Sequence, residues 1–83
     1  MNPLREARFR WGQRVRAGIS LLNDGSYPDC APDAVLVAGG EWGEIVQVGH
    51  HVEANLPVYL VEFAIPGQPV RVVGCLEEEL LAE

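Results

Sequence analysis

The sequence contains no lysine, and its six basic residues, all arginines, are outnumbered by twelve acidic residues. The resulting net charge of −6 is unfavourable for binding the phosphate backbone of a nucleic acid. Aromatic side chains, which would stack on bases, make up only 7% of the chain. We therefore expect no nucleic-acid partner, although Arg10, Arg14 and Arg16 share one face of a predicted strand and keep a nucleic-acid-binding protein open as an alternative.

Long apolar runs and a secretion signal are also missing. The longest uninterrupted apolar run, residues 34–38, has five residues, whereas a membrane-spanning helix needs about 20. The arginine-containing N-terminus is not followed by the apolar region that a signal peptide requires. These absences predict a cytoplasmic protein that makes no membrane contact.

Cysteine is scarce as well, because Cys30 and Cys75 are the only two. In a reducing cytoplasm, free thiols are expected rather than a disulfide. One chain with two thiolates cannot supply the four ligands that an iron–sulfur cluster usually takes, and the CxxC signature of zinc sites does not occur. His50 and His51 have no third ligand at metal spacing. We therefore expect no metal and no cofactor.

The 83 residues of the sequence are enough for one domain, and 48% of them are hydrophobic. Hydrophobic and polar residues alternate in short segments. Residues 11–19 and 58–63 alternate with period two, which is typical of half-buried strands, and residues 70–73 are expected to form another strand. Ile45 and Val48 are three residues apart, so a β-bulge is expected to turn both inward. Trp11 and Ala17 are expected on the inward face of the first segment. The expected core comprises Val15, Ile19, Ile45, Val48, Tyr59, Val61, Phe63 and Val72.

Residues 23–34 are rich in turn formers and form the one long predicted loop. Asp24-Gly25 is a strong turn signal, and Pro28 and Pro32 interrupt regular strand pairing. Together with the strands, this predicts an all-β fold, a small SH3-like five-stranded barrel with a long first loop. Residues 1–8 are expected to form a tail or a short helical turn, and residues 9–83 the domain.

Five motifs in order carry a resemblance to a known family. They are Phe9-x-Trp11-Gly12-x-x-Val15-Arg16, Asn23-Asp24-Gly25-Ser26-Tyr27-Pro28, Gly43-x-Ile45-x-x-Val48-Gly49, Val58-Tyr59-x-Val61-x-Phe63 and Arg71-Val72-Val73-Gly74-Cys75-x-Glu77-x-Glu79-Leu80. In this combination the chain resembles the NifZ family of nitrogen-fixation proteins, from about residue 9 to residue 81.

The resemblance implies a non-enzymatic accessory factor in maturation of the nitrogenase molybdenum–iron protein, linked to completion of its P-clusters. The implied partner is that protein or its assembly intermediate, bound transiently. No catalytic residues are expected. The expected partner-binding residues, in the 23–33 loop and near the chain end, are Asp24, Gly25, Tyr27, Pro28, Cys75 and Glu77.

Several alternatives stay open at this point. Tyr27 could be an aromatic anchor for the partner or could pack back onto the barrel and order the loop. Cys75 could be a buried apolar residue or a thiol that contacts a partner or cluster precursor. Cys30 lies outside the motifs, so the resemblance gives it no role. Besides the nucleic-acid-binding SH3-like barrel, an accessory barrel subunit of an iron–sulfur or redox enzyme remains a rival function.

Overall fold

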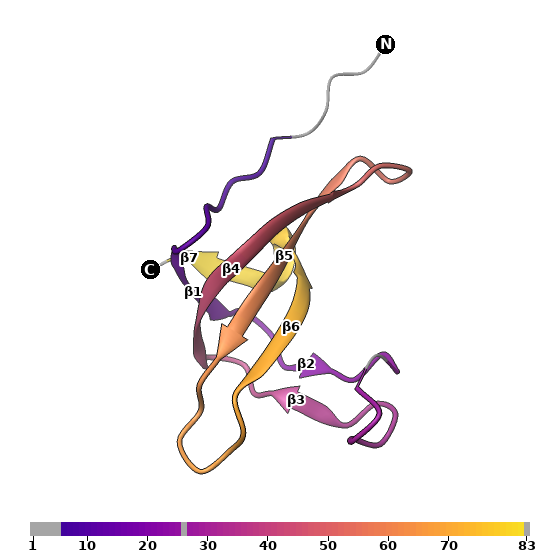
Figure 1. Cartoon of the computed structure of the whole chain (residues 1–83), viewed down its shortest axis with the longest axis vertical. Coiled ribbons are helices and arrows are strands. Elements are labelled where there is room, and N and C mark those ends of the chain that lie inside the picture. The colour runs from indigo at the N-terminus through magenta and orange to yellow at the C-terminus, as the bar shows by residue number, and fades with distance from the viewer. Residues whose placement is uncertain (1–5, 26, 83) are drawn as a thin grey trace.

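The computed structural model describes residues 6–25 and 27–82, and these residues form β-structure almost throughout (Figure 1). The elements are β1 (Arg14–Ala17), β2 (Leu21–Leu22), β3 (Val35–Val37), β4 (Trp42–His51), β5 (Leu56–Phe63), β6 (Arg71–Leu76), the single-turn 3₁₀-helix η1 (Glu77–Glu79) and β7 (Leu80–Ala82). The predicted all-β class is therefore confirmed.

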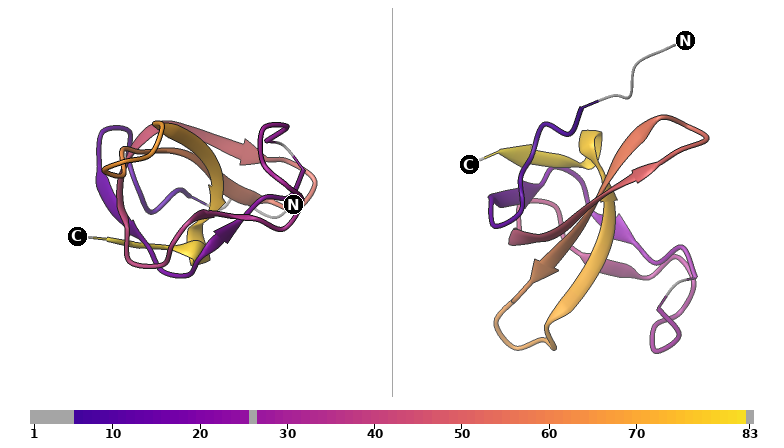
Figure 2. Two further views of the ribbon diagram at one scale, coloured as in Figure 1. Left: turned by 90° about the horizontal axis from the view of Figure 1, so that it is seen from below. Right: turned by 45° about the horizontal axis from the view of Figure 1, so that its top comes forward.

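The strands form two sheets that do not close into one barrel. An antiparallel five-stranded sheet has the order β6-β5-β4-β1-β7, and β2 and β3 pair separately with each other. Figure 2 shows the strands wrapping around a common interior, with the small sheet beside β6. No backbone pairing joins the edge strands β6 and β7 within the described residues. The predicted SH3-like five-stranded barrel is thus not confirmed.

Side chains, rather than a backbone ladder, join the small sheet and its loop to β6. The Tyr27 hydroxyl donates a hydrogen bond to the Val72 carbonyl, and Arg71 Nη1 donates to the Leu36 carbonyl at 2.8 Å. β2 and β3 contain only two and three residues, so little strand is left to pair with β6.

The predicted bulge in β4 is present where the sequence indicated it. Ile45 faces Val61 and Val48 faces Tyr59 on β5, and the register between the strands shifts between Ile45 and Gln47. Ile45 is fully buried and Val48 packs against the core. The extra residue therefore turns both apolar side chains inward, as expected.

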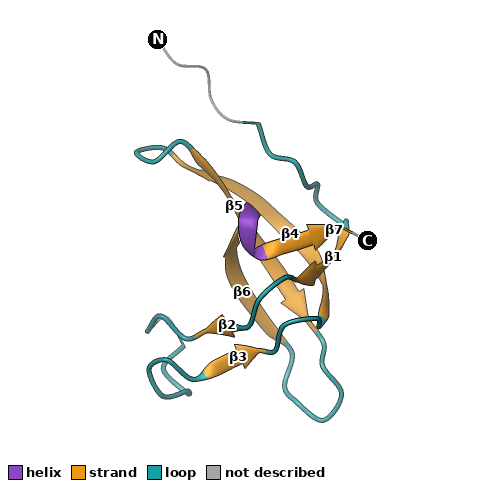
Figure 3. Cartoon of the chain, turned by 180° about the vertical axis from the view of Figure 1, so that it is seen from behind, coloured by secondary structure: helices purple, strands orange, loops and turns teal. Residues whose placement is uncertain are grey.

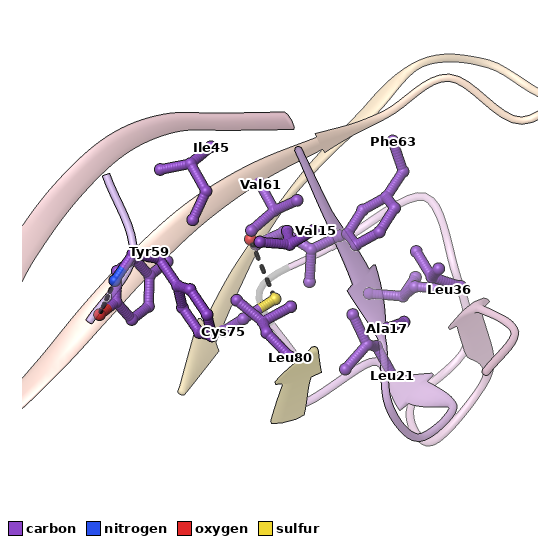
Figure 4. Packing of buried hydrophobic residues seen from close by; sticks show 13 residues of the cluster. Val15, Ala17, Leu21, Leu36, Ile45, Tyr59, Val61, Phe63, Cys75 and Leu80 are labelled. Atoms are coloured by element: carbon purple, nitrogen blue, oxygen red, sulfur yellow. Dashed lines mark hydrogen bonds between the residues drawn. The ribbon is translucent and has the colours of Figure 1, made fainter. Parts of the chain in front are cut away.

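The core lies between the five-stranded sheet and the small sheet (Figure 4). Its buried residues are Phe9, Val15, Ala17, Leu21, Leu36, Val37, Ile45, Tyr59, Val61, Phe63, Val73, Cys75 and Leu80. Five of the eight expected core residues are therefore confirmed as buried, and Val48 is partly buried against them.

Two expected core residues, Ile19 and Val72, are instead exposed, by 55% and 40%. β1 ends at Ala17 and a bend follows, so the alternation does not reach Ile19. Val72 pairs with the exposed Glu62, while its neighbour Val73 points inward. A pair of adjacent valines does not reveal which one is buried. Trp11, also expected to face inward, is 75% exposed because it lies in a turn before β1.

The ends of the domain add little regular structure. Residues 6–8 contain no helix or strand, and the rest of the tail or helical turn expected over 1–8 lies outside the described residues. Within the described part of the chain, the helical structure is far too short and polar to cross a membrane.

Candidate functional site

The predicted partner-binding residues come from two segments, the 23–34 loop and the chain end from Cys75 to η1. The loop extends from the small sheet, and η1 lies between the end of β6 and the start of β7 (Figure 3). The geometry of each segment determines which of these residues can touch another molecule.

Asn23 organises the loop from within. Its side chain is 2% exposed, and Nδ2 lies within hydrogen-bonding distance of the carbonyls of Tyr27, Cys30 and Ala31 at 2.9, 3.0 and 3.1 Å. Its Oδ1 accepts from the backbone N–H groups of Gly25 and Tyr27 at 3.0 and 3.2 Å. One buried amide therefore satisfies backbone groups that the loop cannot pair in a strand. No local sequence pattern indicated this role of Asn23, although the residue begins the second motif.

The loop presents some predicted residues to solvent and turns another back onto the domain. Asp24, Gly25 and Pro28 are exposed, and Gly25 has a φ of 103°, which favours glycine. Tyr27 is half-buried against the core and its hydroxyl bonds to Val72. Its ring therefore orders the loop, whatever else it contacts.

At the chain end, Cys75 is 1% exposed and points into the core (Figure 4). Burial, and to a smaller extent the nearby Glu79, raise the pKa of the Cys75 thiol to about 12. Its Sγ donates to the Val73 carbonyl at 3.5 Å. The thiol is thus protonated at neutral pH and a poor nucleophile.

Glu77 takes part in a buried network with Tyr59. The Tyr59 hydroxyl donates to Glu77 Oε2 at 2.8 Å and accepts from the backbone N–H groups of Arg8 and Phe9 at 3.0 and 3.3 Å. Glu77 Oε2 also accepts from Arg8 N at 3.1 Å. Burial, followed by the hydrogen bond to Glu77, raises the pKa of Tyr59. This network fastens the N-terminal segment over the core, and the Phe9 and Tyr59 rings meet edge to face with centroids 5.3 Å apart.

One groove brings the two predicted segments together. It has a volume of about 430 Å³ and is lined by Leu21, Leu22, Asp24, Val58, Val73, Gly74, Cys75, Leu76 and Glu79. We call it the β2–β6 groove. Asp24 and Cys75 are both in its lining, whereas Gly25, Tyr27, Pro28 and Glu77 are not. Leu22, which was not among the predicted partner-binding residues, is 53% exposed in this lining.

No group of three or more potential metal ligands occurs among residues 6–25 and 27–82. The two histidines at the end of β4 instead hold the β4–β5 turn. His50 Nε2 lies 2.9 Å from Asn55 Oδ1, and His51 Nδ1 accepts from Ala54 N at 3.1 Å. The arrangement as a whole offers a groove for binding and no described cluster that would hold a metal.

Comparison with known proteins identifies the family. The family model described as NifZ domain matches residues 6–82. Similar proteins include Protein NifZ of Azotobacter chroococcum mcd 1, 38% identical over 89% of this chain and 44% of that protein, and Protein NifZ of Azotobacter vinelandii, 36% identical over the same shares. Protein NifZ of Frankia alni is 38% identical over 86% of this chain and 35% of that protein.

The chain spans less than half the length of these curated relatives. No solved structure matches it significantly. The family model nevertheless covers nearly the whole chain, and the predicted resemblance is confirmed. This chain belongs to the NifZ family.

Proposed function

We propose that this domain is a non-enzymatic accessory unit in nitrogen fixation. It acts in the cytoplasm on the nitrogenase molybdenum–iron protein or an assembly intermediate of it, and assists completion of the P-clusters by transient docking. Membership of the NifZ family is the observation that carries this proposal.

The β2–β6 groove supports a docking role. Its walls come from β2 and the loop start on one side and from β5, β6 and η1 on the other, so a partner would touch both segments at once. Binding residues commonly lie on loops that a rigid scaffold holds in place, and Asn23 fixes this loop from inside. The exposed residues Asp24, Gly25 and Pro28 would extend the contact beyond the groove, while Tyr27 and Glu77 hold its flanks in position.

Two side chains of types that can react, the Cys75 thiol and the Tyr59 hydroxyl, have structural roles instead. This supports a binding role rather than catalysis. Cys75 is buried with a raised pKa and would contact a partner only along the groove. Tyr59 is fully buried, and its hydroxyl is hydrogen-bonded to Glu77 and to two backbone N–H groups. Neither group is arranged to exchange protons with a substrate.

Leu22→Gln tests the groove, with Val52→Gln as its matched control. Leu22 is an exposed leucine of the groove lining, while Val52 is 77% exposed in the β4–β5 turn. Removing an apolar contact at an interface typically weakens binding by about 1 kcal/mol or more. We expect Leu22→Gln to lower nitrogenase activity and P-cluster content in a nitrogen-fixing host that lacks its own NifZ protein, and Val52→Gln to leave both unchanged.

Both variants must first show the melting temperature of the parent domain. Equal activity of Leu22→Gln and Val52→Gln would place docking elsewhere. If the parent chain does not restore P-cluster content in this host, the proposed function itself fails. Tyr27→Ala compared with Glu53→Ala is a less direct test, because losing the bond to Val72 also loosens the loop.

A further inference from the structure

The outer face of the five-stranded sheet carries two arginines that share one tryptophan. The Cζ atom of Arg14 lies 4.6 Å from the centroid of the Trp42 ring, and that of Arg16 lies 5.5 Å from it. Arg16 faces Trp42 directly across the β1–β4 pair, and Leu81 of β7 faces Arg16 from the other side. We call Arg14, Arg16 and Trp42 the arginine–tryptophan face.

Among the described residues, neither guanidinium group donates a hydrogen bond or forms an ion pair. The backbones of Arg14 and Arg16 pair within the sheet, and their side-chain contacts across residues 6–25 and 27–82 are the two with the Trp42 ring. Arg14 lies directly opposite Glu44, yet the structure records its cation–π contact with Trp42 and no ion pair with that carboxylate. Two like charges are therefore held at one ring, a repulsive arrangement that a bridging anion would relieve.

The same face is open enough to receive a ligand. A cleft of about 360 Å³ is lined by Arg14, Trp42, Gly43, Glu44, Glu62 and Ala64. Trp42 is 36% exposed and Leu81 46% exposed, so apolar surface adjoins the two cations. An aromatic ring with planar, bidentate arginine donors suits carboxylate recognition.

Two features distinguish among anionic partners. Glu44 and Glu62 line the cleft beside Arg14, and the domain as a whole carries a charge of −6. A continuous phosphate backbone would be repelled by both. A protein segment can instead place one or two carboxylates on the arginines and put uncharged or donor groups against Glu44 and Glu62.

We propose that the arginine–tryptophan face is a second docking surface, which binds a carboxylate-bearing segment of a protein partner. It lies on the outer side of the sheet, and its residues are separate from those of the β2–β6 groove. The proposal therefore stands whether or not the groove binds nitrogenase. Carboxylates accept hydrogen bonds from Arg14 and Arg16, while the Trp42 ring holds both guanidinium groups in place.

The test uses as the probe an acetylated, amidated peptide of two glutamates separated by two glycines, so that uncharged backbone can lie against Glu44 and Glu62. Trp11→Phe leaves Trp42 as the only tryptophan, so Trp42 fluorescence reports binding at low salt. We expect saturable binding that weakens as salt is added. In this background, Arg14→Gln with Arg16→Gln should weaken binding about tenfold or more, because two charge-assisted contacts are lost. Arg10→Gln removes an exposed arginine that does not stack on Trp42 and should change binding less than about twofold.

Three results would overturn the proposal. The first is unchanged affinity in the double variant, provided that its melting temperature matches the parent. The second is an equal loss in Arg10→Gln, which would indicate unspecific attraction to arginine. The third is tighter binding of a single-stranded oligonucleotide than of the diglutamate peptide, with the same dependence on Arg14 and Arg16, which would favour a nucleic acid.

Discussion

Tyr59→Phe isolates the buried hydroxyl that joins the N-terminal segment to the chain end. The ring stays, so packing against Phe9 is retained, and only the oxygen is lost. The hydroxyl accepts a hydrogen bond from Phe9 N and donates one to Glu77 Oε2. It is also one of two acceptors for Arg8 N. The variant thus leaves one buried N–H without its partner and removes a donor from a buried carboxyl group.

The expected loss of stability follows from these contacts. Leaving a buried polar group unsatisfied costs about 1–3 kcal/mol, and a hydrogen bond to a charged group contributes about 1.5–3 kcal/mol. Because Glu77 retains its bond from Arg8 N, we expect a total loss of about 2–3 kcal/mol rather than the sum. Small domains are stable by about 5–15 kcal/mol, so this change is a large fraction of the whole.

Urea unfolding followed by circular dichroism measures the effect, with Tyr27→Phe as the control. The Tyr27 hydroxyl bond to Val72 is exposed, so its loss should lower the free energy of unfolding by about 1 kcal/mol or less. The slope of the transition should be the same in all three proteins. A Tyr59→Phe variant within about 0.5 kcal/mol of the parent would refute the reasoning, as would a larger loss in Tyr27→Phe.

Because the pKa of Tyr59 is raised, its contribution to the free energy of unfolding should also depend on pH. Above pH 10, the unfolded tyrosine releases its proton while the folded one still holds it, so the unfolded state binds fewer protons. The contribution of Tyr59 is therefore complete below pH 10 and is lost as pH rises through the folded pKa. Tyr59→Phe should show a shallower alkaline loss of stability than the parent; identical slopes would contradict this.

Three further predictions concern the loop, the sheet and the thiols. Asn23→Ala leaves several loop carbonyl and N–H groups without a hydrogen-bond partner. The free energy of unfolding should fall by about 2–4 kcal/mol in urea titrations, and proteolysis between residues 24 and 33 should be faster. Gly43→Ala places a Cβ 2.7–2.9 Å from β5 atoms and should lower the melting temperature strongly. In Gly74→Ala the new Cβ has its nearest neighbour at 3.8 Å, so the melting temperature should change little. Equal shifts in the two variants would contradict the close approach of β5 to Gly43. Half-buried Cys30 should react with Ellman's reagent at pH 8 in the native protein, while Cys75, whose pKa burial raises to about 12, should react only after unfolding, and native labelling of Cys75 would show that β6 opens.

The β-class, most strand positions and the family could be predicted from the sequence, because these depend on local patterns. Alternation predicted the inward face of β5, with Tyr59, Val61 and Phe63 all buried. The three-residue spacing of Ile45 and Val48 was enough to predict the bulge in β4. Turn formers marked the 23–34 loop correctly.

The residues that form the candidate site were harder to predict from the sequence. Asp24 and Cys75 were both selected, and they do line one groove, but Leu22 was not. Glu77 was expected to face a partner and is instead 7% exposed, bonded to Tyr59 and to the backbone of Arg8. Residues distant in sequence make these contacts, so no local pattern announces them.

By itself, the sequence determined that this chain forms short twisted strands around an apolar interior and that it belongs to the NifZ family. Only the tertiary structure decided that the small sheet is held to β6 by Tyr27 and Arg71 instead of by a closed ladder. It also decided that Val73 rather than Val72 is buried, and that Arg14 stacks on Trp42 rather than pairing with Glu44. The physical reason is that periodicity orients side chains within one strand, whereas pairing between strands and competition among their neighbours determine which partner each side chain meets.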